Sequence, residues 1–373
     1  MLTRRDFGKL ALAGLPAAAV FGRAESIFGA LPQAKHNSLI EGVQIGTITY
    51  SFRSMADQSA EATLKYVVGS GISAIELMGG PVESFAGAPA AVPGGGGRAA
   101  ATSPRPQTPA GSGRTTGGAA ATPAPAAASG SWAGQPCPAP AGRGEGGGGG
   151  HGQTAEQQEQ ARKLKAWRTS VSMDPFKKLR KMYNDAGVTI YAWKQLNTNM
   201  SDEELDYIFD VAEALGCTHT TVELPTDPAQ LKRLGDLAMK KKIYAGYHTH
   251  AQGSMTAFDQ AFAISKGNMA NVDFGHWVAG GNVGGTPLQF LQKHHDRIVS
   301  FHLKDRTTPQ HCALNLPWGT GETPIKDILQ TVKKNQWKIP GSIELEYDIP
   351  QGSDAVKEVR KCVDYCRSAL TSS

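Results

Sequence analysis

Short apolar runs alternate with amphipathic segments along most of the chain. Eight runs rich in β-branched and aromatic residues have the length of buried strands, and they cover residues 43–50, 72–78, 188–193, 219–224, 243–248, 269–274, 298–303 and 341–346. Helical segments lie between and after them, at residues 60–69, 154–167, 175–186, 201–215, 227–241, 287–294, 325–335 and 353–370, with a further helix before residue 269. Repeated strand–helix units with short connections predict an α/β protein, a closed (β/α)8 TIM barrel over residues 41–373.

The alternation breaks down between residues 79 and 151. Gly, Ala, Pro and Ser dominate this segment, including the glycine run 146–150. Such a composition buries too little apolar surface to offset the entropy of ordering the chain. We therefore expect a long disordered insertion after strand two of the barrel, acting either as solvated filler or as a lid.

The first residues have the pattern of an export signal. Arg4 and Arg5 are followed by Phe7, Lys9 and an apolar run to about Val20. This pattern resembles a twin-arginine signal, and the apolar run is too short for a stable membrane span in the mature protein. We expect residues 1–24 to be a leader and the protein to be periplasmic or exported.

The charge balance and the cysteine content bear on the expected binding partners and on the expectation of disulfides. Of the 373 residues, Lys and Arg exceed Asp and Glu by only five, without a concentrated basic stripe, which argues against nucleic-acid binding. The five cysteines are odd in number and include no CxxC pair. We expect free buried or surface thiols and no disulfide framework.

Titratable side chains occur where many of the predicted strands end. They are Glu76, Glu223, His248, His250, Asp273, His276, His302, Lys304, Asp305, Glu344 and Glu346. In a TIM barrel these ends share the face that carries the active site. Burying several carboxylates together is costly unless a cation neutralises them, and a carboxylate–imidazole set without cysteine suits Mn²⁺, Mg²⁺, Co²⁺ or Zn²⁺. One divalent metal ion is therefore predicted at the barrel mouth.

Four motifs resemble those of the sugar phosphate isomerase/epimerase family, which are xylose isomerase-like TIM barrels. They are Tyr-His-Thr-His at 247–250, Val-Asp-Phe-Gly-His at 272–276, His-Leu-Lys-Asp at 302–305 followed by Gly-Thr-Gly-Glu at 319–322, and Ser-Ile-Glu-Leu-Glu-Tyr at 342–347. The resemblance spans about residues 42–370, apart from the insertion. It implies one divalent ion held by two Glu, one Asp and one His. Here it indicates Asp273, His302 and Glu344.

The fourth ligand is where this sequence departs from the family pattern. The family glutamate usually comes from strand five, which here supplies His248 and His250. Glu223 on strand four is the available carboxylate and the expected ligand, with a strand-five histidine as the alternative. Glu344 and Glu346 share one face of their strand, and we favour Glu344 as the ligand.

The resemblance implies a metal-dependent isomerase or epimerase that abstracts a proton next to a carbonyl through a metal-stabilised enediolate. Expected catalytic residues are Glu223, Glu344, His248 and Lys304, and expected substrate contacts are His250, His276, Glu346 and Trp193. Alternatives are core packing for Trp193 and an ion pair with Asp305 for Lys304.

Other functions remain open at this point. The same proton abstraction would serve an exported lyase or dehydratase acting on keto-sugars or 3-keto-glycosides. A metal-dependent endonuclease shares the fold, but export and the missing basic stripe argue against it. A non-catalytic sugar-binding barrel is a further alternative. The expected partner is a small sugar or sugar derivative, and a homo-oligomer is compatible with the sequence.

Overall fold

The computed structural model describes residues 37–90, 130–137 and 154–372. The predicted leader and the greater part of the predicted insertion lie outside the described residues. None of the helices in the described ranges is long and apolar enough to cross a membrane.

Eight parallel strands form a closed barrel, as predicted. They are β2 (Val43–Ile48), β3 (Ala74–Met78), β6 (Thr189–Lys194), β7 (His219–Glu223), β8 (Tyr244–His248), β9 (Asn268–Asp273), β10 (Ile298–Leu303) and β13 (Gly341–Ile343). Each pairs with the next, and β13 pairs with β2 to close the ring. The short strand β1 (Leu39–Ile40) adds to β2 in the antiparallel sense.

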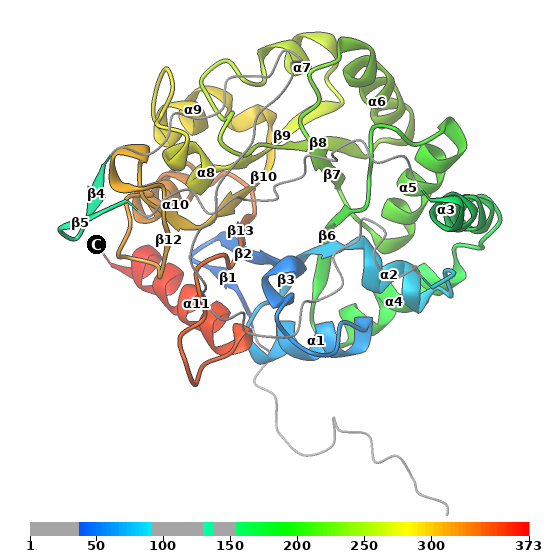
Figure 1. Cartoon of the computed structure of the whole chain (residues 1–373), viewed down its shortest axis with the longest axis horizontal. Helices are drawn as coiled ribbons and strands as arrows, with labels where there is room; N and C mark the ends of the chain where they lie inside the picture. The colour runs from blue at the N-terminus through cyan, green and yellow to red at the C-terminus, as the bar shows by residue number, and fades with distance from the viewer. Residues whose placement is uncertain (1–36, 91–129, 138–153, 373) are drawn as a thin grey trace, which may run out of the picture. The chain divides into compact units, whose positions relative to one another are not determined.

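Helices surround this ring of strands in Figure 1. They are α1 (Ala60–Gly69), α2 (Gly79–Phe85), α3 (Ala155–Arg168), α4 (Asp174–Asp185), α5 (Asp202–Leu215), α6 (Pro228–Lys241), α7 (Asp259–Ile264), α8 (Phe274–Ala279), α9 (Pro287–His294), α10 (Ile325–Asn335) and α11 (Ala355–Thr371). Ser201 opens α5 with a capping box to Glu204, as its sequence predicts. Helix α8 follows β9 directly and was not predicted.

The two faces of strand β10 have opposite polarity. Phe301 and Leu303 of β10 belong to the apolar core, whereas Ser300 and His302, the alternate residues, are buried polar groups. Because side chains alternate along a strand, one face of β10 packs against the helices and the other carries polar groups into the barrel. The interior of this barrel is therefore where buried hydrogen bonds and charges collect.

Two parts of the predicted insertion are folded, so the expectation of disorder is wrong for them. Helix α2 buries Val82, and Glu83 forms an ion pair with Arg168 of α3, at 2.8 Å, with both side chains buried. Residues 130–137 form a hairpin of β4 (Ser131–Trp132) and β5 (Gln135–Pro136). These contacts depend on residues far along the chain, which local composition does not reveal.

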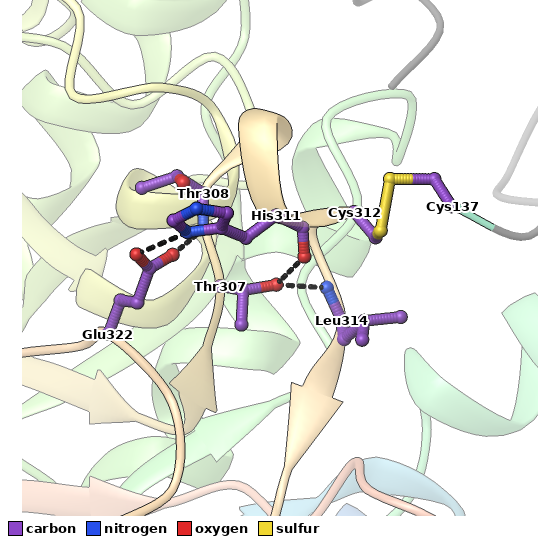
Figure 2. Close-up of a disulfide and its surroundings, with 7 residues drawn as sticks. All are labelled: Cys137, Thr307, Thr308, His311, Cys312, Leu314 and Glu322. Carbon is purple, nitrogen blue, oxygen red and sulfur yellow. Dashed lines mark hydrogen bonds and ion pairs between the residues drawn. A yellow bond between two sulfur atoms is a disulfide. The ribbon is translucent and has the colours of Figure 1, made fainter. Parts of the chain in front are cut away.

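The hairpin is tied to the barrel by a disulfide, which corrects the expectation of free thiols. Cys137 bonds to Cys312 across 175 residues of sequence, while the other three cysteines are free and buried. Trp132 also packs its ring on His311, with ring centroids 5.6 Å apart. Figure 2 shows the disulfide beside His311, whose Nδ1 lies 2.6 Å from Glu322 Oε1. The hairpin is thus anchored to the loop that follows β10.

Candidate metal centre

Four buried side chains from successive strands converge at the carboxyl ends of the barrel strands. They are His248 at the end of β8, Asp273 at the end of β9, His302 on β10 and Glu344 directly after β13. One ligand atom of each lies within 4.8 Å of those of the other three. We call these four residues the mouth cluster. Parallel pairing brings the strand ends together, so residues 96 positions apart at the extremes, from 248 to 344, form one donor set.

His302 lies at the centre of the cluster between two carboxylates. Its Nδ1 lies 2.8 Å from Glu344 Oε2, and its Nε2 lies 2.8 Å from Glu76 Oε2. Burial opposes a charge on this ring, but the two carboxylates raise the pKa of His302 to about 10. Burial would likewise raise the pKa of Glu76, yet His302 holds it at about 2. The ring and its neighbours form a fully buried charged network.

Lys304 bridges three carboxylates at the same mouth. Its Nζ lies 3.0 Å from Asp273, 2.9 Å from Glu344 and 2.8 Å from Glu346. Burial disfavours the ammonium, but these carboxylates raise the pKa of Lys304 above its usual value. The ion pair with Asp305 that was the alternative for Lys304 is not formed. Asp305 instead accepts hydrogen bonds from the backbone of Gly319, Gly321 and Thr323.

The two carboxylate oxygens of Asp273 have different surroundings. Oδ1 accepts a hydrogen bond from the backbone N–H of His276 at 2.7 Å and caps the start of α8. Oδ2 accepts no hydrogen bond from any described donor, although it lies within ion-pair distance of Lys304. Burial, together with the charge of Glu344, raises the pKa of Asp273, and Lys304 opposes this shift. This buried oxygen faces the cluster and is available to a cation.

A divalent ion fits this donor set, provided that binding displaces the proton that His302 holds on Nδ1 toward Glu344. Two imidazoles and two carboxylates without a thiolate are donors that Zn²⁺, Mn²⁺ and Co²⁺ accept. His248 is neutral, because burial and the charges of Lys194 and His302 lower its pKa to about 3. Oδ2 of Asp273 accepts no hydrogen bond within the described residues and is the ligand atom that this side chain would supply, beside the ammonium of Lys304. The mouth cluster is therefore the candidate metal centre.

Glu223 lies outside the mouth cluster. Its Oε2 is 3.0 Å from His250 Nδ1 and its Oε1 is 3.3 Å from Lys194 Nζ, and half of its side chain is exposed. Burial would raise the pKa of Glu223, but the hydrogen bond from His250 and the charge of Lys194 lower it. The expected ligand role of Glu223 stays a prediction, and the geometry favours the open alternative, a strand-five histidine.

His276, a residue of α8, lies beside the mouth cluster. Arg306 donates to its Nδ1 at 2.6 Å, and a guanidinium cannot accept a hydrogen bond. Burial and the charges of Lys304 and Arg306 lower the pKa of His276 far below its usual value, so the ring is neutral with its hydrogen on Nε2. That Nε2 has no hydrogen-bond partner among the described residues and is a donor available to a ligand.

Three histidines, His248, His250 and His276, also bring ligand atoms within 4.8 Å of one another. The bond from Arg306 occupies the lone pair of His276 Nδ1 and leaves a hydrogen on Nε2. His276 would have to give up this bond to coordinate an ion through Nε2, so we place the ion in the mouth cluster.

Trp193, the tryptophan expected to contact substrate, is a core residue, as is Trp277. Trp193 is fully buried and meets Tyr207 of α5 edge-on, with ring centroids 6.1 Å apart. Trp277 is fully buried against Phe290. The expectation that Trp193 contacts substrate is corrected, because its side chain points from β6 toward the helices. Core packing, the alternative, is what the structure has.

Sequence reasoning did not assign roles to several polar residues at this site. They are Glu76, Lys194, Asn271 and Arg306. Glu76 had a detectable signal as a titratable strand residue, and Arg306 follows the His-Leu-Lys-Asp motif directly. Asn271 carries no charge and Lys194 resembles a surface lysine, so neither had a signal that separates it from ordinary strand residues.

Comparisons with known proteins agree with the barrel fold. A family model described as xylose isomerase-like TIM barrel matches residues 163–368. No curated protein matches the chain significantly.

Solved structures share the fold at low sequence identity. A sugar phosphate isomerase/epimerase from Parabacteroides distasonis has a TM-score of 0.52 at 14% identity, with 89% of this chain and 96% of that one covered. A xylose isomerase domain protein from Alicyclobacillus acidocaldarius has 0.51 at 12%, with 88% and 100% covered. The IOLI protein with a binding zinc atom has 0.50 at 11%, with 89% and 100% covered. With more than half of its length matched by the family model, the chain belongs to the xylose isomerase-like TIM-barrel family.

Proposed function

We propose that the protein is a metal-dependent isomerase or epimerase that moves a proton next to the carbonyl of a sugar or sugar-like substrate. The observation that carries this proposal is the mouth cluster, with four buried donors at the functional end of the barrel. One structural neighbour is a sugar phosphate isomerase/epimerase and another has a bound zinc atom, and both support the proposal.

His248, Asp273, His302 and Glu344 would hold the ion. When bound, a divalent ion supplies Lewis-acid polarisation of a carbonyl or hydroxyl oxygen. The chain's own residues then have to bind the rest of the substrate and carry the proton.

The pair of His250 and Glu223 is the proposed proton carrier. His250 Nδ1 donates to Glu223, which leaves Nε2 of the ring to accept a substrate proton. This hydrogen bond raises the pKa of His250, so the ring is a stronger base than a free histidine. The pair reaches solvent, since nearly half of the His250 side chain is exposed. His250 is thus proposed as the base, where the sequence indicated a substrate contact.

Substrate oxygens would be held by neighbouring donors. His276 offers its Nε2–H, and Lys304 lies beside it within the carboxylates of the cluster. A neutral imidazole donor of this kind binds a hydroxyl or carbonyl oxygen without adding charge. Glu346, the most exposed of the three carboxylates around Lys304, can accept a hydrogen bond from a sugar hydroxyl.

A second candidate is elimination from a keto-sugar or 3-keto-glycoside after the same proton abstraction. The Cys137–Cys312 disulfide favours it, because disulfides persist in oxidising compartments and sugar phosphates are scarce outside the cytoplasm. We propose for the same reason that the chain is exported through its twin-arginine sequence. Replacing Arg4 and Arg5 by Lys should retain the full chain in the cytoplasm, as cell fractionation would measure.

One substrate screen tests the function. The full chain loaded with Mn²⁺ or Zn²⁺ is incubated with ketoses, aldoses and 3-keto-glycosides, and products are separated by chromatography. An epimer or isomer supports the first candidate, and a released aglycone supports the second. Asp273→Asn keeps the cap of α8 but weakens a ligand, so it should lose activity while staying folded. If the wild-type protein binds no divalent ion and turns over no substrate, the protein is a non-catalytic barrel.

A further inference from the structure

Glu76 is a buried carboxylate on β3, on the other side of the barrel interior from β9 and β10. Its side chain is fully inaccessible to solvent. Thr221 Oγ1 donates to its Oε1 at 2.7 Å, and His302 Nε2 and Asn271 Nδ2 lie 2.8 Å and 3.4 Å from its Oε2. Each of these donors comes from a different strand. A buried carboxylate without such partners would be costly, so its position is set by this network.

Asn271 connects Glu76 to a second histidine, His248, by hydrogen bonds from the two ends of its amide group. An ionised carboxylate can only accept hydrogen bonds, so the amide nitrogen of Asn271, and not its oxygen, must point toward Glu76. The same nitrogen donates to Ser300 Oγ at 2.6 Å. The amide oxygen is left facing His248 Nδ1 at 3.0 Å, and an oxygen acceptor requires a hydrogen on that ring nitrogen.

The network therefore determines which nitrogen each ring turns toward the mouth cluster. Nε2 of His302 is hydrogen-bonded to Glu76, and Nδ1 of the same ring lies 2.8 Å from Glu344 and 3.9 Å from Asp273. His248 uses Nδ1–H for Asn271 and keeps the lone pair on Nε2. One carboxylate outside the cluster thus acts on two of its four members, directly on one and through an amide on the other.

We propose that Glu76 is a positioning residue that orients the ring of His302, fixes the ring tautomer of His248 through Asn271, and thereby prepares the cluster to bind a divalent ion. This inference rests on the proposed function, because it concerns the same ion. Hydrogen bonding of the second ring nitrogen to a carboxylate is a known way to orient a histidine ligand. Here a single residue orients two ligands, the second through an intervening amide.

Three variants separate positioning from a purely structural role. Glu76→Gln keeps the volume but removes the acceptor-only group, so both rings lose their fixed orientation. Asn271→Leu breaks only the connection to His248. Ser300→Ala is the matched control, because it removes a buried hydrogen bond to Asn271 while leaving the path from Glu76 to His248 intact.

Two measurements are made on each full-length variant. Zn²⁺ affinity is measured by competition with a chromophoric chelator, and the tautomer of His248 is measured by ¹⁵N NMR on metal-free protein. We expect Zn²⁺ affinity to fall about 10- to 100-fold in Glu76→Gln, less in Asn271→Leu and about two-fold or less in Ser300→Ala. The Nδ1–H form of His248 should be lost in the first two variants and kept in the third.

The outcomes distinguish this inference from the proposed function. Unchanged affinity and an unchanged tautomer in Glu76→Gln and Asn271→Leu would overturn the positioning role, while the metal centre would stand. A wild-type protein that binds no Zn²⁺ would refute the proposed function, and the NMR result would still decide whether Glu76 sets the tautomer. If Glu76→Gln does not fold, Asn271→Leu against Ser300→Ala gives the same decision for His248.

Discussion

Three of the histidines at the mouth each have their proton placed by a neighbour on one ring nitrogen. Asn271 accepts from His248, Arg306 donates to His276, and Glu223 accepts from His250. The first two rings are buried and neutral, because burial and nearby cations lower the pKa of each. Only His250 combines partial exposure with a raised pKa. At the scale of single residues, His250 is therefore the histidine that suits the proposed proton transfer.

Replacing His250 by Asn should lower kcat about 10²- to 10⁴-fold, the range for loss of a general base, with Zn²⁺ affinity nearly unchanged. Glu223→Gln should give a smaller loss, because the base remains but its orienting carboxylate does not. Steady-state kinetics and chelator competition measure the two effects. Glu322→Gln is the control, since Glu322 makes a comparable contact to His311 away from the mouth. A loss of Zn²⁺ affinity as large as the loss of kcat would instead make His250 a ligand.

The charges of Glu76 and His302 predict how the stability of metal-free protein depends on pH. The pKa of Glu76 is lowered from 4.5 to about 2, so its stabilisation is present above pH 4.5 and is lost as pH falls. The pKa of His302 is raised from 6.5 to about 10, so its stabilisation is complete below pH 6.5 and is lost as pH rises.

The buried neutral rings of His248 and His276 have lowered pKa values, so they oppose folding increasingly as pH falls below 6.5. The free energy of unfolding of chelator-treated protein should therefore be highest near pH 6.5 and decline on both sides. Urea unfolding at a series of pH values measures it. In His302→Asn the decline on the alkaline side should be much weaker. A wild-type maximum near pH 9 would show that the buried charges are paired differently.

At the scale of elements, loops that follow neighbouring strands fix one another. The loop after β10 carries Arg306, which contacts α8, and Cys312, which bonds to the β4–β5 hairpin. Gly275 in α8 allows Lys304 to pass closely, because a Cβ there would lie 2.2 Å from Lys304 Cγ. Contacts between elements, more than the local sequence of each, hold the mouth in shape.

Removing the disulfide should destabilise the protein without removing the metal centre. The bond closes a long stretch of chain, and such a cross-link contributes about 2–4 kcal/mol by restricting the unfolded state. For Cys137→Ala with Cys312→Ala we expect Tm to fall by about 5–10 °C. Wild-type protein treated with reductant should melt like the double variant, while Zn²⁺ affinity should stay within about two-fold. Equal Tm values with and without the bond would mean that the hairpin adds nothing to stability.

At the scale of the whole molecule, the ion should stabilise the folded barrel. Ligands from β8, β9, β10 and β13 meet only when the barrel is closed, so binding is linked to folding. At 100 times its Kd, a ligand that binds only the folded state adds about 2.7 kcal/mol. We expect Zn²⁺ to raise Tm by about 5–10 °C in wild-type protein and by much less in Asp273→Asn. The same rise in both proteins would place the ion elsewhere.

Much of the fold was predictable because its signals are local. Strand-length apolar runs, capping residues such as Ser201 and the order of strands and helices are written within short stretches, and they predicted the closed barrel. The convergence of Asp273, His302 and Glu344 was predictable for the same reason, since each stands near the end of its own strand and all parallel strands end on one face.

Tertiary structure decided which residues act together. Glu76 and His302 are 226 residues apart, and Cys137 and Cys312 are 175 apart, so no local pattern joins them. The folding of α2, the outward direction of Trp193 and the pairing of Glu223 with His250 also depend on distant partners. The sequence determines which side chain stands at the end of each strand. Closure of the barrel determines the distance between those groups, and distance and burial determine their charge and chemistry.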